Sequence, residues 1–150
     1  MQSVELRGGA ATKHRARGFS LVELMIALVV IVILVSLALP SYKNYVIRNS
    51  RQQAQTLLLS LAGLEEKIFL NSGAYAVGPS KVTNAYDGSV SGGLGLGTDK
   101  SPDGRYSVAV TGTTTTYLLT ASPISNGPQA GDGDITLDDA GSRKWNGKPW

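Results

Sequence analysis

The stretch RARGFSLVEL (residues 15–24) decides the fold of this chain, because it joins a basic tail to an apolar run that continues to Leu39. The basic tail ends at Gly18 and the apolar segment begins at Phe19. Glu23 is the single charged residue between Phe19 and Leu39. A charged side chain near the centre of a bilayer costs roughly 2.5–3.5 kcal/mol even on lenient insertion scales. We therefore expect Glu23 to have a partner, and that partner is central to function.

The apolar segment is long enough to cross a membrane. Its extent, about 21 residues, corresponds to roughly 32 Å of helix. The basic residues of the tail before Phe19 predict a cytoplasmic N-terminus and an exported remainder. Four basic residues and one acid precede Phe19, and this excess of three equals the net charge of +3 of the 150-residue chain. The rest of the chain is therefore neutral and offers no global excess of charge to a polyanion.

Three interpretations of this N-terminal region compete. The first is a plain transmembrane anchor. The second is a secretory signal peptide cleaved after Ala38, although the apolar run exceeds the usual ~7–15 residues and contains an acid. The third is cleavage on the cytoplasmic side between Gly18 and Phe19, with the apolar helix retained. Only the third provides a partner for Glu23, because the new α-amino group of Phe19 lies four residues away, in the same chain or in an axially shifted copy.

The run from Gly18 to Met25, with the apolar segment and Pro40 after it, resembles the N-terminal signature of type IV prepilins and pseudopilins. The resemblance implies that a prepilin peptidase cleaves after Gly18 and methylates Phe19. It implies that Glu23 neutralises the amine of a neighbouring subunit during assembly. It also implies a helix that bends at Pro40 and continues.

The sequence after Pro40 predicts that continuation. Apolar and small residues recur at spacings of three and four from Ile47 to Ile68, as in an amphipathic helix. Asn71-Ser72-Gly73 is typical of a helix end, with Gly73 suited to a left-handed cap. We expect one helix from about Phe19 to Asn71, with a transmembrane and assembly half (19–39) and an amphipathic half (40–71). Tyr42 and Tyr45 lie where aromatic residues anchor at a membrane surface.

The remaining residues, 72–150, predict a small globular head. Gly, Ser and Asn are dense over 72–104, which indicates a long loop. The region 105–150 predicts strands over 106–111, 115–121 and 135–137. An antiparallel meander covering the amphipathic stripe gives an α+β, pilin-like fold.

The layout from Tyr106 onward resembles minor pilins of the PilE type, many of which carry a cysteine pair in this region. This chain has no cysteine. We expect the rings of Trp145 and Trp150 to be buried and to stabilise the region instead.

Nothing in the chain predicts an enzyme or a cofactor. The only histidine, His14, falls in the leader (1–18) that we expect to be removed, so no His-based triad or metal site remains. The Gly-rich run 92–97 fits neither a dinucleotide fingerprint nor a P-loop and is interpreted as a flexible loop. Calcium ligands remain an alternative, since acidic residues cluster late in the chain at Asp132, Asp134, Asp138 and Asp139.

The sequence thus favours a structural subunit of a type IV pilus, most like a minor pilin, that resides in the bacterial inner membrane and then in an extracellular filament. Its implied partners are other pilin subunits, the prepilin peptidase and the assembly platform. A type II secretion pseudopilin is one alternative. A DNA receptor for natural transformation is another: six basic residues of the head are candidates for an exposed cluster, although the neutral net charge argues against it. The six are Lys81, Lys100, Arg105, Arg143, Lys144 and Lys148.

Overall fold

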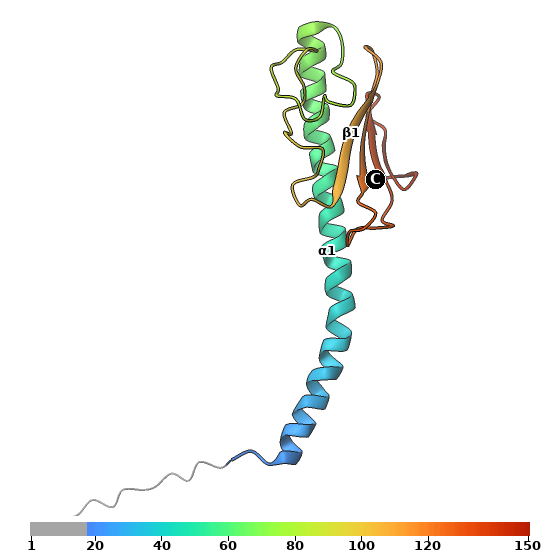
Figure 1. The fold of residues 1–150 in the computed structure, drawn as a ribbon. Helices are drawn as coiled ribbons and strands as arrows, with labels where there is room; N and C mark the ends of the chain where they lie inside the picture. Colours follow the sequence, from blue (N-terminus) through green and yellow to red (C-terminus); the bar gives the residue numbers. More distant parts are fainter. Residues whose placement is uncertain (1–17) are drawn as a thin grey trace, which may run out of the picture. The chain divides into compact units, whose positions relative to one another are not determined.

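The computed structural model describes residues 18–150; the rest of the predicted leader, His14 included, lies outside the described residues. The described residues divide into two units, 18–40 and Ser41–Trp150. One helix, α1 (Leu21–Ser72), contributes to both, and Pro40 lies inside it without ending it (Figure 1). The predicted continuation of the helix past Pro40 is confirmed.

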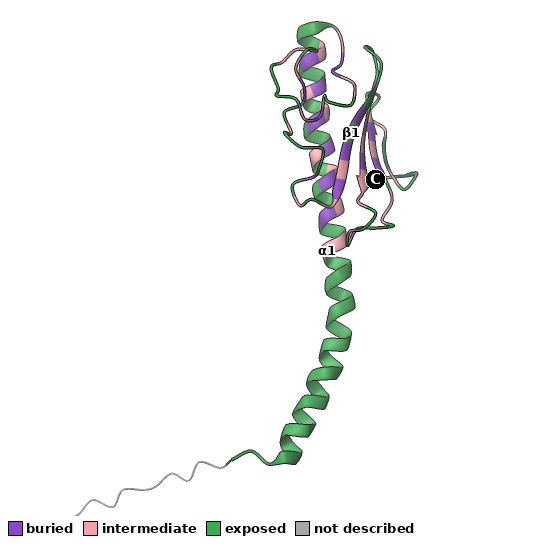
Figure 2. Ribbon diagram, viewed as in Figure 1, coloured by how far each residue is buried: buried purple, intermediate pink, exposed green. Residues whose placement is uncertain are grey.

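In the first unit, every described residue of α1 up to Pro40 is exposed (Figure 2). The helix is long and apolar enough to cross a membrane. It begins at Leu21, two residues later than predicted, because Ser20 caps it.

In the second unit, α1 presents a buried stripe. Its members recur at spacings of three and four and comprise Ser50, Ala54, Leu58, Leu61, Glu65 and Ile68. The helix ends as predicted: Gly73 adopts φ 70°, and its N–H donates to the carbonyl of Phe69 at 2.8 Å.

A five-stranded antiparallel sheet packs against this stripe in the order β1-β2-β3-β4-β5. Its strands are β1 (Tyr106–Gly112), β2 (Tyr117–Pro123), β3 (Ile135–Asp138), β4 (Arg143–Trp145) and β5 (Lys148–Pro149). Alternate residues of the first three strands are buried and join the helix stripe in one core. The predicted α+β class and the first three strands are confirmed, whereas β4 and β5 were not predicted.

The segment between α1 and β1 contains no helix and no extended strand, and it packs closely. Lys81 Nζ donates to the carbonyls of Val90, Ser91 and Gly92 at 2.6, 3.0 and 3.0 Å. Leu94 is buried, and a Cβ on Gly93 would lie 2.5 Å from the carbonyl oxygen of Lys81. The Gly-rich run therefore packs closely against the 81–85 turn, which the interpretation as a flexible loop did not foresee.

Candidate assembly motif and nucleic-acid interface

The predicted processing site lies in an exposed, non-helical segment. Gly18, Phe19 and Ser20 precede α1, and Phe19 is 80 % exposed. An extended, accessible peptide is what a protease needs around the bond that it cleaves. The structure thus leaves the Gly18–Phe19 bond outside regular structure, whereas the alternative cut after Ala38 would fall within the helix.

Glu23 lies in the first turn of α1, at the third helical position. Ser20 Oγ accepts a hydrogen bond from the Glu23 N–H at 3.2 Å, and the Ser20 carbonyl accepts one from the Leu24 N–H at 3.2 Å. A serine followed three residues later by glutamate is a capping-box pattern, which the sequence analysis missed. The carboxylate of Glu23 therefore also lies at the positive end of the helix dipole, where an acid is favoured.

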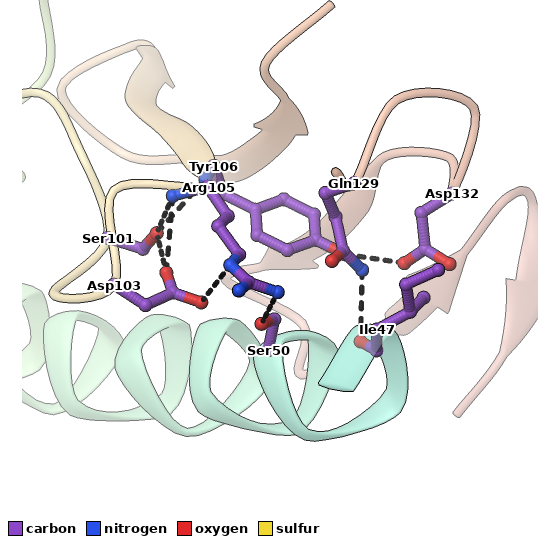
Figure 3. A network of polar contacts seen from close by, with 8 residues as sticks. All are labelled: Ile47, Ser50, Ser101, Asp103, Arg105, Tyr106, Gln129 and Asp132. Atoms are coloured by element: carbon purple, nitrogen blue, oxygen red, sulfur yellow. Dashed lines mark hydrogen bonds and ion pairs between the residues drawn. The ribbon is translucent and has the colours of Figure 1, made fainter. Parts of the chain in front are cut away.

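In the head, a buried polar network fastens the segment between β2 and β3 to the helix. Gln129 and Asp132 belong to this segment, and Tyr106, the first residue of β1, lies beside Gln129 (Figure 3). The Tyr106 hydroxyl donates to Asp132, and Gln129 Nε2 is within hydrogen-bond distance of the Ile47 carbonyl (3.0 Å) and of the Tyr106 hydroxyl oxygen (2.9 Å). Arg51 forms a bidentate ion pair with Asp132. We call Arg51, Tyr106, Gln129 and Asp132 the polar clamp.

The charge states of the clamp follow from burial and hydrogen bonding. The side chain of Asp132 is 6 % exposed and that of Arg51 is 18 % exposed. Burial opposes ionisation of Asp132, but the hydrogen bonds from Arg51 and Tyr106 outweigh it and hold the pKa of this carboxyl below its usual range. Burial and the bond to Asp132 raise the pKa of the Tyr106 hydroxyl. Asp132 is thus an anion paired with Arg51 and cannot serve as a free metal ligand.

Trp145 completes this arrangement. Its Nε1–H donates to the Asp132 carbonyl at 2.7 Å, and the Arg51 guanidinium carbon lies 3.5 Å from the centroid of its ring. Trp145 and Trp150 are both half-buried and pack against the core. Both rings are half-buried where burial was expected, and their contribution to the stability of this region stays a prediction.

The terminal hairpin, residues 143–149, is the main element that sequence reasoning missed. Trp145 pairs with Lys148 across a two-residue turn in which Asn146 has φ 50° and Gly147 has φ 75°. Asn-Gly with positive φ at both positions is the preferred turn of a tight hairpin. The dipeptide was therefore a readable signal, hidden by the shortness of both strands.

The six basic residues proposed as one cluster fall into different settings. Lys81 binds three carbonyls of the loop, and Arg105 donates to Ser50 Oγ at 3.2 Å and lies 3.9 Å from Asp103. Lys100 lies beside β1, at the other edge of the sheet from β4. The expected single cluster is therefore wrong for these three residues.

The other three basic residues, Arg143, Lys144 and Lys148, are together on the terminal hairpin and are exposed. Within residues 18–150 none of them forms an ion pair. The last ten residues of the chain contain these three cations and no acid. This local excess of positive charge is hidden in the zero net charge of residues 19–150.

The four aspartates considered for calcium do not form a common site. Asp132 belongs to the clamp, and Asp138 Oδ1 accepts from the Ser142 N–H at 2.7 Å as part of a turn. Among residues 18–150, no three His, Cys, Asp or Glu side chains come close enough to hold a metal ion.

Comparison with known proteins agrees with the N-terminal and head geometry. Residues 40–136 match the family model described as "Type IV minor pilin ComP, DNA uptake sequence receptor". Residues 13–39 match the model of the prokaryotic N-terminal methylation motif. Fimbrial protein EcpC of Eikenella corrodens is 30 % identical over 127 residues, which cover 83 % of this chain and 74 % of that protein.

Proposed function

The chain belongs to the type IV minor pilin family, and from that premise we propose that it is trimmed at Gly18, assembled into a pilus and used there to bind DNA. Membership of this family implies a structural protein that assembles with other pilins and is not an enzyme. The family match is to a pilus subunit, which favours a pilus over a type II secretion system. The inner membrane, a cytoplasmic N-terminus, the prepilin peptidase and the assembly platform are parts of the proposal.

Processing after Gly18 is supported by the exposed Gly18–Phe19 segment and by the methylation-motif match over residues 13–39. Mass spectrometry of the protein purified from its host membrane should find a mature N-terminus at methylated Phe19. A mature N-terminus at Leu39 would instead identify a signal peptide cleaved after Ala38, and an intact N-terminus would identify a plain anchor.

Assembly through Glu23 is supported by its position as the single acid of an exposed apolar helix segment. Cleavage creates an amine on Phe19 that can pair with Glu23 of a neighbouring subunit. Glu23→Ala should leave cleavage intact and lower incorporation into pili about tenfold, which corresponds to ~1.4 kcal/mol for one charge-assisted hydrogen bond. Leu28→Ala, in the same exposed segment, is the control. Normal incorporation of the Glu23→Ala protein would contradict the pairing role.

DNA binding is supported by one observation above all: the three cations of the terminal hairpin are exposed and form no ion pair within residues 18–150, in a chain whose family model is described as a DNA uptake sequence receptor. Arg143 also lies over the Trp150 ring, 5.6 Å from its centroid. Phosphate contacts by Lys and Arg supply most of the non-specific affinity of a protein for DNA. Trp145 faces Arg51 and the Nε1 of Trp150 is buried, so stacking of bases on these rings is not part of the proposal.

The test uses the full chain in detergent micelles and labelled double-stranded DNA, with fluorescence anisotropy over a range of salt concentrations. The triple variant Arg143→Gln, Lys144→Gln, Lys148→Gln should weaken binding at every salt concentration. It should also reduce the slope of log K against log salt by about 2–3, since each phosphate contact contributes about 0.9.

The matched control neutralises three exposed cations of α1, as Lys43→Gln, Arg48→Gln, Lys67→Gln. Both triple variants lose the same charge, so only a local contact distinguishes them. Equal weakening by the two variants would overturn the hairpin as the contact, and absence of DNA binding by the unmodified protein would overturn the function.

A further inference from the structure

The head carries a groove whose lining residues take no part in the contacts proposed above for assembly and DNA binding. It has a volume of about 350 Å³ and lies between residues 42–47 of α1 and the segment that joins β2 to β3. Its lining is mainly apolar and carries two cationic side chains; it comprises Tyr42, Lys43, Val46, Ile47, Arg105 and Pro128. An apolar surface beside cationic groups suits a ligand that is itself amphipathic and anionic.

The two cations have hydrogen-bonding capacity to spare. Arg105 has five N–H donors, of which one bonds Ser50 Oγ, while its Nε lies 3.9 Å from Asp103. Lys43 is exposed and forms no ion pair within residues 18–150. Burial opposes ionisation of Asp103, but hydrogen bonds from the Ser101 hydroxyl and the Arg105 N–H hold the pKa of Asp103 low. The Asp103 carboxylate is therefore an anion that offsets one of the two cations. The groove therefore keeps a net positive charge.

The position of Tyr42 and Lys43 in the chain indicates which kind of anion the groove binds. Tyr42 and Lys43 follow Leu39, the last residue of the apolar run, by three and four positions. At about 1.5 Å per helical residue this is roughly 6 Å, the depth of a phospholipid headgroup layer. Tyr42 and Tyr45 are 66 % and 62 % exposed, as expected of rings that anchor at a membrane surface.

We propose that this groove binds the headgroup of an anionic phospholipid while the subunit is inserted in the membrane, before it assembles into a pilus. The phosphate lies between Lys43 Nζ and the free N–H groups of Arg105. The glycerol and the first acyl carbons lie against Val46, Ile47 and Pro128. Such a site fixes the head to the membrane surface before assembly, and removal of the subunit from the bilayer empties it. The proposal is independent of DNA binding.

The test uses the full chain in nanodiscs of phosphatidylcholine, alone or mixed with phosphatidylglycerol. Amine acetylation followed by mass spectrometry reports the accessibility of each lysine. Acetylation of Lys43 should slow about fivefold when phosphatidylglycerol is present, since one basic residue near an anionic surface contributes about 1 kcal/mol. Lys67, exposed near the other end of the head's helix, is the internal control and should react at the same rate in both lipids.

A charge-matched pair of variants separates a built site from general attraction to an anionic surface. Arg105→Gln removes a cation that lines the groove, whereas Arg48→Gln removes one that does not. Arg105→Gln should abolish most of the protection of Lys43, and Arg48→Gln should leave it. Equal effects of the two variants would overturn the site. Protection that is the same in both lipids and rises with protein density would also overturn it, because the occupant would then be a second copy.

Arg105 also contacts Ser50, so an independent measurement avoids that substitution. Native mass spectrometry of the protein released from the mixed nanodiscs should show retained phosphatidylglycerol. Lys43→Gln should lose the lipid, and Lys67→Gln should keep it. Retention by the Lys43→Gln protein would contradict the proposal.

Discussion

The two parts of α1, Leu21–Pro40 and Ser41–Ser72, differ in what covers their apolar residues. Every residue of the first part is exposed, although nearly all are apolar. The second part buries a single stripe against its own sheet and loop. Continuous backbone hydrogen bonding is common to both, so the difference lies in the side chains. The first part requires lipid or neighbouring helices to cover it, whereas the second is covered within its own chain.

The acids of the two parts sharpen the contrast. Glu23 is exposed in the first turn of the helix, while Glu65 is fully buried in the stripe and accepts from the Ala76 N–H at 2.8 Å. Burial raises the pKa of Glu65 to about 6. The chain thus provides its own donor for the acid of the head and leaves the acid of the assembly segment available to another subunit.

The largest expected effect comes from truncating one leucine in each part. Leu58 is fully buried, so Leu58→Ala should lower the free energy of unfolding of the head by about 2–5 kcal/mol. Leu28→Ala, at an exposed position, should leave the head unchanged. Denaturant unfolding in mild detergent, followed by tryptophan fluorescence, reports the head alone because both tryptophans belong to it. A comparable loss in both variants would remove the distinction between the two parts.

A smaller loss is expected from the polar clamp, which ties only the second part of the helix to the sheet. Asp132→Asn leaves Arg51 without its anion and should destabilise the head by about 2–3 kcal/mol at neutral pH. Because folding lowers the pKa of Asp132 from 3.8, its contribution is present above pH 3.8 and is lost as pH falls further. Asp134→Asn, at an exposed position, is the control. Identical unfolding of the two variants at neutral pH would contradict the role of the clamp.

Substitution of Glu65, the buried acid of the second part, should change the free energy of unfolding by a still smaller amount. The pH dependence of the Glu65 contribution is opposite to that of Asp132. The folded pKa of Glu65, about 6, lies above its ordinary value of 4.5, so the contribution of this acid to stability is fully present below pH 4.5 and is lost as pH rises through 6. Glu65→Gln should flatten this dependence and recover about 1–2 kcal/mol at pH 7.5. Glu66→Gln, exposed next to it, controls for the loss of one charge. A pH profile unchanged by Glu65→Gln would show that another group titrates.

The same contrast explains what the sequence could predict. Periodic patterns predict the helix and the first three strands, because each element buries one face at regular spacing. The end of the helix at Gly73 is predicted by a local glycine signal. The polar clamp depends on contacts between residues about 80 positions apart, such as Arg51 and Asp132, and no periodicity records these. The strands of the terminal hairpin are only three and two residues long, which is too short to show a period. The role of Lys81 was missed for the same reason, since its partners are backbone carbonyls that any sequence would provide.

The smallest expected effect concerns a local signal in the first part of the helix that was readable but missed. Ser20→Ala removes the acceptor of the Glu23 N–H and should cost about 0.5–1 kcal/mol at the helix start. Hydrogen exchange of the Glu23 amide in micelles should accelerate up to about fivefold, since ~1 kcal/mol corresponds to that factor. Ser36→Ala is the control, because Ser36 Oγ only donates to the Ile33 carbonyl within the helix. If Ser20→Ala does not change the exchange rate of the Glu23 amide, the stability of the first helical turn does not depend on the Ser20 cap. Acceleration would show that the chain itself places the helix start at Leu21, and so sets the position of Glu23 before any other subunit meets it.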